Sequence, residues 1–228
     1  MAIRLASYQP LIYNPDGYSA HIRHNLPPFV DSSCRREPDF ESPYPSITAL
    51  CRRGTFAPHL SPNDIVVYIT RKGAYLDVYP PHWRLTAILR VAKRFATHEQ
   101  AAAWYDAQGI AVPSNCLVPG NGPVPLAWTG RASQRSTPPS PPTASAHPLP
   151  MVDRTLQDWD AWYQSIAHNP EDEALRVFLA CEPEFVDVWQ ARVITPETMC
   201  KIFGRIPGTQ NPAKITENDV DALRSLCS

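Results

Sequence analysis

Glycine is scarce in this sequence, whereas proline is abundant. The 228 residues include only 9 Gly but 26 Pro, and a proline content of about 5% would be usual. So many prolines imply extended, punctuated connections, which disfavours an all-helical bundle. Hydrophobic residues make up 43% of the chain, near the globular average, so we expect a true core in one domain or in one domain with an appendage.

The usual signatures of catalysis and cofactor binding are missing as well. The sequence has no P-loop, no GxGxxG after a strand, no GxSxG, no HExxH and no EF-hand. Its six cysteines form no CxxC pair, and no apolar run approaches 20 residues. We therefore expect no cofactor, no metal and no membrane segment, and we expect a soluble cytoplasmic protein with reduced thiols.

Charge is nearly balanced overall but unevenly distributed. Residues 1–100 carry 12 Lys and Arg against 8 Asp and Glu, a charge of +4, whereas residues 151–228 carry 7 against 13, a charge of −6. The near-neutral total argues against tight nonspecific binding to long duplex DNA, which needs many phosphate contacts. The basic front half is compatible with a phosphate-bearing ligand, and an ordinary mixed surface explains it equally well.

One segment, residues 129–150, has low complexity. It is rich in Pro, Ser, Thr and Ala and has no large apolar residue before Leu149, so it cannot bury enough surface to offset the entropy of ordering. The sequence predicts a linker or a disordered insertion here, and the choice decides whether residues 151–228 form a second domain. Residues 13–45 are rich in turn residues.

Several segments have the composition of β-strands. The clearest is 63–70, NDIVVYIT, where β-branched residues follow an Asn-Asp turn. Segment 83–95 alternates for much of its length, which predicts a strand with one buried and one partly basic face. The first nine residues are a plausible strand, and 46–56 is a strand or one or two helical turns. Segment 175–189 is either two short strands around a Glu-Pro-Glu turn or partly a helix.

Capping residues mark the predicted helices. In 97–109, Thr97 and Gln100 predict a capping box and Gly109 a C-terminal stop. An apolar stripe predicts a helix in 155–168, and the stretches TPETMCKIFG and TENDVDALRSL predict two short capped helices. The sequence therefore predicts an α+β protein with several short strands, peripheral helices and long Pro-rich loops.

Three candidate chemistries have weak support. His21 and His24 have a spacing that could bind a metal on a helix, but they lie in the turn-rich segment without a second ligand pair. Cys51 is flanked by Arg52 and Arg53, which would depress a thiol pKa, but no His or acid is identifiably paired with it. The acidic residues of PEDEA and EPEFVD could form an acid/base pair. However, carboxylates near helix starts usually interact with the helix dipole and with solvent.

Aromatic and basic residues gather in and around the segment 62–95. Aromatic rings stack on nucleobases, and guanidinium groups bind phosphates and also stack. A pocket for a flipped base needs both groups, together with short polar side chains for the base edge. The alternative, in which the rings fill the core and the arginines keep the surface soluble, accounts for the residue types equally well. The candidate nucleotide-binding residues are Ser46, Thr48, Arg53, Tyr68, Thr70, Arg71, Tyr79, Trp83 and Arg84.

The order of features from SITALC through PNDIVVYIT to RLTAILRVAKRF and the following helix resembles the nucleotide-modification-associated domains of prokaryotes and phages. It is more distantly similar to the PUA-like group that includes the ASCH, EVE and YTH domains. The resemblance implies one domain, 1–228, with 129–150 as a disordered insertion. It also implies a small, strongly curved PUA-like β-barrel with helices packed outside, and a base pocket between barrel and helix.

By this resemblance, Trp83 and Tyr68 would wall the pocket while Ser46 and Thr48 would hydrogen-bond the base edge. The function implied is a non-catalytic reader, or accessory protein, for a modified nucleotide or a flipped base in nucleic acid. Two alternatives stay open: an enzyme such as a hydrolase or transferase that uses Cys51 or a carboxylate, and a protein-interaction module. The sequence does not indicate an oligomeric state.

Overall fold

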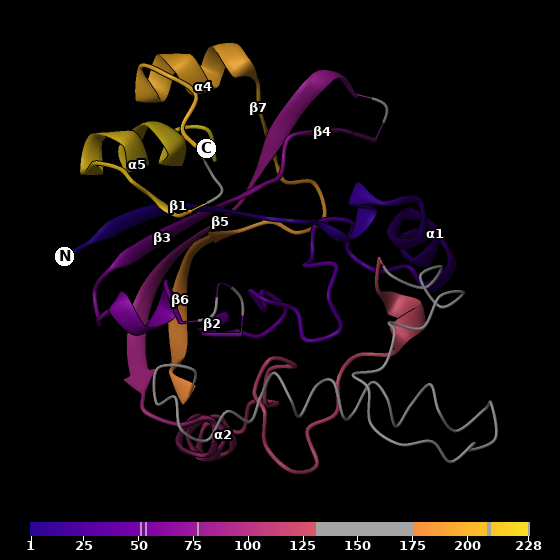
Figure 1. Cartoon of the computed structure of the whole chain (residues 1–228), viewed down its shortest axis with the longest axis vertical. Helices are drawn as coiled ribbons and strands as arrows, with labels where there is room; N and C mark the ends of the chain where they lie inside the picture. The colour runs from indigo at the N-terminus through magenta and orange to yellow at the C-terminus, as the bar shows by residue number, and fades with distance from the viewer. Residues whose placement is uncertain (51, 53, 77, 131–175, 209–210, 228) are drawn as a thin grey trace, which may run out of the picture.

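The computed structural model describes residues 1–50, 52, 54–76, 78–130, 176–208 and 211–227. Within these residues, eight strands form one mixed sheet that curls into a half-barrel (Figure 1). The strands are β1 (Ile3–Tyr8), β2 (Ser46–Thr48), β3 (Ile65–Thr70), β4 (Gly73–Tyr75), β5 (Val78–Phe95), β6 (Phe178–Val186), β7 (Arg192–Ile194) and β8 (Ala213–Lys214). The predicted α+β class with a curved sheet is thereby confirmed, and the sheet closes only half a barrel.

The strand order is β2-β6-β5-β3-β1-β8, and β4 and β7 both pair with β5. Strands β1 and β3 run parallel, whereas the other pairs are antiparallel. The pairing places β6, which follows residue 175, between β2 and β5. The chain on both sides of residues 131–175 therefore contributes to the same sheet.

Two apolar clusters lie on the two faces of this sheet. One contains Tyr8, Tyr68 and Leu89 and is covered by residues of the segment 40–60. The other contains Trp83 and is covered by the two C-terminal helices. All six residues of β3 are buried because neighbours cover both of its faces, which explains its continuous β-branched sequence.

Strand β5 differs from its predicted pattern. Thr86 and Ile88 belong to the face that was expected to be partly basic, but both are fully buried, and Arg84 on the same predicted face is only 7% exposed. Irregular pairing between β3 and β5 near Tyr68 also shifts the register. As a result Leu85 joins the Trp83 cluster, whereas Ala87 packs with Tyr68. A strictly alternating pattern therefore could not predict which face of the sheet each residue of β5 occupies.

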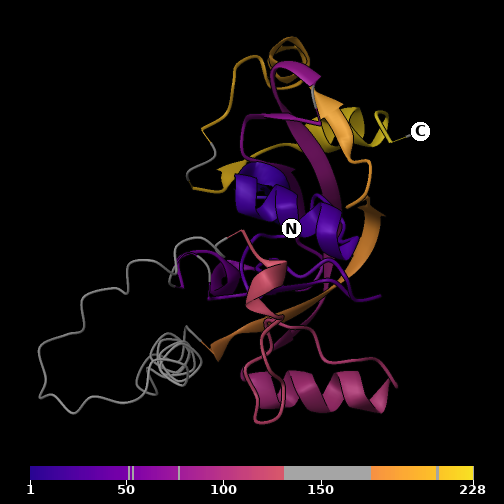
Figure 2. The same cartoon turned by 90° about the vertical axis from the view of Figure 1, so that its right-hand side faces the viewer.

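The helices of the described residues lie around the sheet. They are α1 (Pro15–His24), α2 (His98–Ala107), α4 (Pro196–Phe203) and α5 (Glu217–Arg224). Both views place α2 at the opposite end of the molecule from α4 and α5 (Figure 2). None of the described helices is long and apolar enough to cross a membrane.

The predicted caps of three helices are present. Thr195 accepts from the N–H of Thr198 in front of α4, and Thr216 and Asp219 form a full capping box at α5. Thr97 caps α2 as predicted, but the Gln100 side chain accepts from the N–H of Ala96 rather than that of Thr97. The predicted box at α2 is therefore incomplete.

Two local predictions are wrong. Segment 178–186 is the single strand β6, not two strands around a turn, because Glu182 and Pro183 pair with β5 and the register shift at Glu184 is a bulge that the strand continues through. The turn-rich segment 13–45 contains the helix α1, which begins at Pro15. The predicted helix 155–168 lies outside the described residues, as does the predicted insertion beyond Gly130. Thr129 is buried and Gly130 donates its N–H to the Ser32 carbonyl.

Candidate functional site

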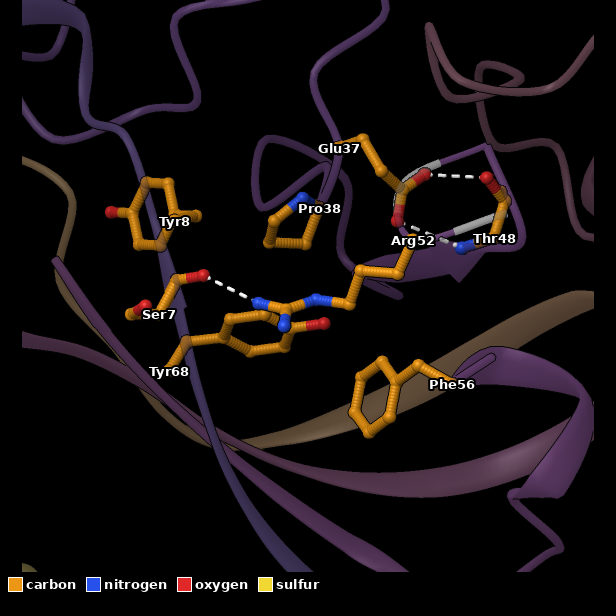
Figure 3. A pocket seen from close by; sticks show the side chains of 8 residues that line it. All are labelled: Ser7, Tyr8, Glu37, Pro38, Thr48, Arg52, Phe56 and Tyr68. Atoms are coloured by element: carbon orange, nitrogen blue, oxygen red, sulfur yellow. Dashed lines mark hydrogen bonds between the residues drawn. The ribbon is translucent and has the colours of Figure 1, made fainter. Parts of the chain in front are cut away.

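A pocket opens between one face of the sheet and the segment that runs from Glu37 to Phe56 (Figure 3). Its hollow measures about 250 Å³ with the open mouth included, and its interior has room for about one water molecule. The sheet contributes side chains from β1, β2 and β3. The lining residues are Ser7, Tyr8, Glu37, Pro38, Thr48, Arg52, Phe56 and Tyr68.

Aromatic rings form the wall of this pocket on the sheet side. Tyr8 and Tyr68 lie edge to face with their ring centroids 6.2 Å apart, and Phe40 packs against both at 5.4 Å. The hydroxyl of Tyr8 donates to the carbonyl of Phe29. These contacts hold the two tyrosines in fixed orientations beside the hollow.

A buried carboxyl group, that of Glu37, lies on the opposite wall. The N–H of Thr48 donates to Oε1 at 2.9 Å, and the Thr48 hydroxyl donates to Oε2 at 2.5 Å. Asn115 donates to Oε2 from the other side at 3.1 Å. Burial raises the pKa of Glu37 to about 8, although the hydrogen bonds from Thr48 and Asn115 partly oppose this. Near neutral pH the carboxyl is therefore largely protonated and can donate as well as accept.

The segment around Glu37 is held by a buried polar network. The Asp31 carboxylate accepts from the N–H groups of Ser33 and Glu37 at 2.9 and 3.1 Å. The Arg36 side chain, only 1% exposed, donates to the Trp128 carbonyl at 3.0 Å. These bonds satisfy polar groups that would be costly to bury alone, and they fix Glu37 at the pocket.

Arg52 closes the mouth of the pocket. Its guanidinium donates from Nη2 to the carbonyl of Ser7 at 2.7 Å and lies 5.8 Å from the ring centroid of Phe56. In the view of Figure 3 the group is drawn below Pro38, and Pro38 and Tyr68 line the same pocket. Ser7 and Arg52 are partly exposed, whereas the other lining residues that the structure describes are buried, so Arg52 lies between the aromatic wall and solvent.

The pocket contains two of the predicted binding residues, Tyr68 and Thr48. Ser46 lies behind it: this residue is fully buried, and its hydroxyl donates to Asn115 at 2.7 Å. The expectation that Trp83 and Tyr68 share a pocket is wrong, because the two rings belong to clusters on opposite faces of the sheet. Trp83 is 5% exposed and packs under α4 and α5 instead, with the Lys72 ammonium 5.0 Å from its ring centroid.

The other predicted residues lie away from the pocket. The connection between β3 and β5 is largely a hairpin in which β4 pairs with the start of β5. Tyr79 on this hairpin is 75% exposed, and Arg71 is exposed and donates to the Gln9 side chain at 3.2 Å. Thr70 accepts from the N–H of Arg84 at 2.9 Å. Arg53 lies outside the described residues.

Arg84 has a structural environment. Its Nε donates to Nε2 of His82 at 3.0 Å, so His82 is the acceptor there and its Nδ1–H donates to the Pro80 carbonyl. Another guanidinium nitrogen donates to the Ala191 carbonyl at 3.0 Å, and the group lies 5.3 Å from the ring centroid of Phe29. These contacts tie β5 to the segment before β7.

The alternative chemistries also have positions in the structure. His21 and His24 lie on α1 rather than in a loop, and the described residues contain no group of three potential metal ligands. Glu184 of the EPEFVD stretch forms ion pairs with Arg90 and Arg224. Cys51 and the PEDEA carboxylates lie outside the described residues.

Glu37 and Tyr8 are lining residues that the binding-site prediction missed. Nothing in the stretch RREPDF distinguishes Glu37 from a solvated turn residue, because its burial comes from contacts with Thr48 and Asn115, which are distant in sequence. Tyr8 ends a strand that the sequence did predict, but its place at the pocket depends on pairing with β3, which puts it opposite Thr70.

No family model, no curated protein and no solved structure matches this chain.

Proposed function

We propose that this protein binds a nucleotide, or an unpaired base of a nucleic acid, in the pocket between Pro38 and Tyr68, and that it acts there as a non-catalytic reader or accessory protein. One observation carries the proposal: an aromatic wall, a buried neutral carboxyl and a guanidinium meet in a single hollow. Rings stack on bases, and a carboxyl hydrogen-bonds a base edge. A guanidinium at the mouth is suited to a phosphate.

The lining chemistry favours binding over catalysis. Among the residues that the structure describes, neither Cys nor His lines the pocket, so these residues give no support to a nucleophile activated by a neighbouring base. One observation favours an enzyme, namely the pKa of Glu37, which burial raises to about 8 and which would suit a general acid. However, Thr48 and Asn115 both donate to this carboxyl, which suits a fixed hydrogen-bonding group.

Binding of ribonucleoside and deoxyribonucleoside monophosphates and of short oligonucleotides, with modified and unmodified bases, tests the proposal. Isothermal titration calorimetry at two salt concentrations measures affinity, and chromatography of the recovered ligand detects any product. We expect at least one nucleotide to bind and to be recovered unchanged. Tyr68→Leu removes the stacking surface but keeps an apolar side chain, and should weaken this binding about 5- to 150-fold, since stacking contributes about 1–3 kcal/mol per base.

Tyr105→Leu is the matched control, because Tyr105 is a buried tyrosine in the separate cluster beneath α2. It should lose stability as Tyr68→Leu does but keep the wild-type affinity. Circular dichroism checks that both variants are folded. Equal affinity of the two variants would place the ligand elsewhere, and turnover that disappears in Glu37→Gln would replace the binding function with the enzymatic one.

A further inference from the structure

Glu37 and Thr48 form a hydrogen-bonded pair on one wall of the pocket (Figure 3). The Thr48 hydroxyl oxygen lies 2.5 Å from Oε2 of Glu37, so one hydrogen lies between these two oxygens. The pair also accepts three N–H groups. Thr48 and Asn115 donate to Oε1 and Oε2 at 2.9 and 3.1 Å, and Leu50 donates to the Thr48 hydroxyl oxygen at 3.1 Å.

The number of O–H groups in this pair depends on the charge of Glu37. When the carboxyl is ionised, the pair has one O–H, that of Thr48, and Glu37 accepts it. When the carboxyl is neutral, the pair has two O–H groups, and only one of them can lie along the short contact between the two side chains. None of the described residues accepts from the second O–H, whether Glu37 or Thr48 carries it. The neutral pair therefore has a spare donor, and the ionised pair has none.

The pocket is the place where this spare donor can meet an acceptor. Both residues line the hollow, and they are only 8% and 1% exposed, so an O–H without an acceptor is costly there. The interior has room for about one water molecule, which is the space for a single acceptor atom. The hollow of about 250 Å³, with its open mouth included, is left for the rest of a ligand.

We propose that this spare O–H donates to a hydrogen-bond acceptor of the bound base, a carbonyl oxygen or an unprotonated ring nitrogen, so that the pocket binds its ligand only while Glu37 carries a proton. This inference rests on the proposed function and assigns the group that the ligand presents to the buried wall. An ionised Glu37 is an acceptor only, so it would face the acceptor of the ligand without a hydrogen between them.

The surroundings of Glu37 favour its neutral form. The charged and titratable groups around it are Asp31, Arg36, Arg52, Tyr8, Tyr68 and Cys181. The negative charge of Asp31 adds to the effect of burial on the pKa of Glu37. Burial also raises the pKa of Tyr8 and of the Cys181 thiol above their ordinary values near 10 and 9, so Glu37 ionises before either of them as the pH rises.

The affinity should therefore depend on pH in one direction. Burial raises the pKa of Glu37 to about 8, so at pH 7 most molecules are already protonated and bind without a change in protonation. At pH 9 most of these carboxyls are ionised and must take up a proton when the ligand binds. We expect an affinity about tenfold weaker at pH 9 than at pH 7, with uptake of about one proton at pH 9.

Isothermal titration calorimetry on the full chain tests the inference with AMP, CMP, GMP and UMP. Titrations at pH 7 and pH 9 measure the affinity, and buffers of different ionisation enthalpy at pH 9 measure the proton uptake. Glu37→Gln has an amide that does not titrate, so it should lose the pH dependence and the uptake. Because the bases of GMP and UMP ionise at high pH, the informative quantity for each nucleotide is the difference between wild type and variant.

Glu182→Gln is the matched control, because this glutamate is exposed on β6. It should keep the pH dependence of the wild type. Circular dichroism at both pH values checks that the variants are folded. If Glu37→Gln binds too weakly to measure, the proton uptake of the wild type decides the question.

The outcomes separate this inference from the proposed function. Tyr68-dependent binding that is as tight at pH 9 as at pH 7, or that takes up no proton at pH 9, keeps the proposed function and overturns the inference. An equal loss of affinity in wild type and Glu37→Gln assigns the pH dependence to another group and overturns it too. Absence of binding for every nucleotide at pH 7 overturns both.

Discussion

Replacing Glu37 by Gln should change how the stability of this protein depends on pH. The carboxyl is buried, and burial raises its pKa from 4.5 in the unfolded chain to about 8. Between these values the folded state binds more protons at this group than the unfolded state does. The contribution of Glu37 to the free energy of unfolding is therefore fully present below about pH 4.5 and is lost as the pH rises through 8.

The shift sets the size of the effect. An interval of about 3.5 pH units at about 1.4 kcal/mol per unit gives a loss of up to about 5 kcal/mol between pH 4.5 and pH 8. Glutamine stays neutral throughout. Its amide oxygen can accept from the N–H of Thr48 and its amide nitrogen can donate to the Thr48 hydroxyl, but this nitrogen cannot accept from Asn115. Glu37→Gln should therefore be less stable than the wild type by about 1–3 kcal/mol at pH 5, and this difference should reverse in favour of the variant by pH 9.

Urea unfolding followed by tryptophan fluorescence at pH 5, 7 and 9 measures the difference. Other groups titrate over this range, so the informative quantity is the difference between wild type and variant at each pH. Glu182→Gln is the control, because this glutamate is exposed on β6. Parallel pH profiles for wild type and Glu37→Gln would refute the reasoning, since they would mean that Glu37 has the same pKa in both states.

Two further predictions concern other parts of the structure. Burial lowers the pKa of His98 to about 4 while its Nδ1 accepts from the N–H of Leu117, so the unfolded state binds more protons and stability should fall by about 2 kcal/mol from pH 7 to pH 5. His98→Gln, followed by thermal unfolding at both pH values, should remove most of that fall, and an unchanged fall would assign it to other groups. A Cβ added at Gly17 would lie 1.7 Å from the Leu11 carbonyl oxygen, whereas one added at Gly122 meets nothing within 4 Å. Gly17→Ala should therefore cost about 1–3 kcal/mol or more in urea unfolding and Gly122→Ala almost nothing, and equal effects would contradict the close packing of α1.

Local chemistry determined the parts of this protein that the sequence predicted well. β-Branched residues and their neighbours predicted β3, and Thr195, Thr216 and Asp219 predicted the starts of α4 and α5, because strand propensity and capping depend on residues close in the chain. The α+β class followed from the same signals.

The candidate site depended on contacts that no local pattern carries. The resemblance to base-binding domains predicted Trp83 beside Tyr68, but the irregular register between β3 and β5 sends the two rings to opposite faces. Glu37 became a buried neutral carboxyl only where β2 brought Thr48 to it and the segment after α2 brought Asn115. The sequence therefore determined which elements form, whereas tertiary packing decided which side chains share the pocket, because the face a strand residue occupies depends on its partners across the sheet.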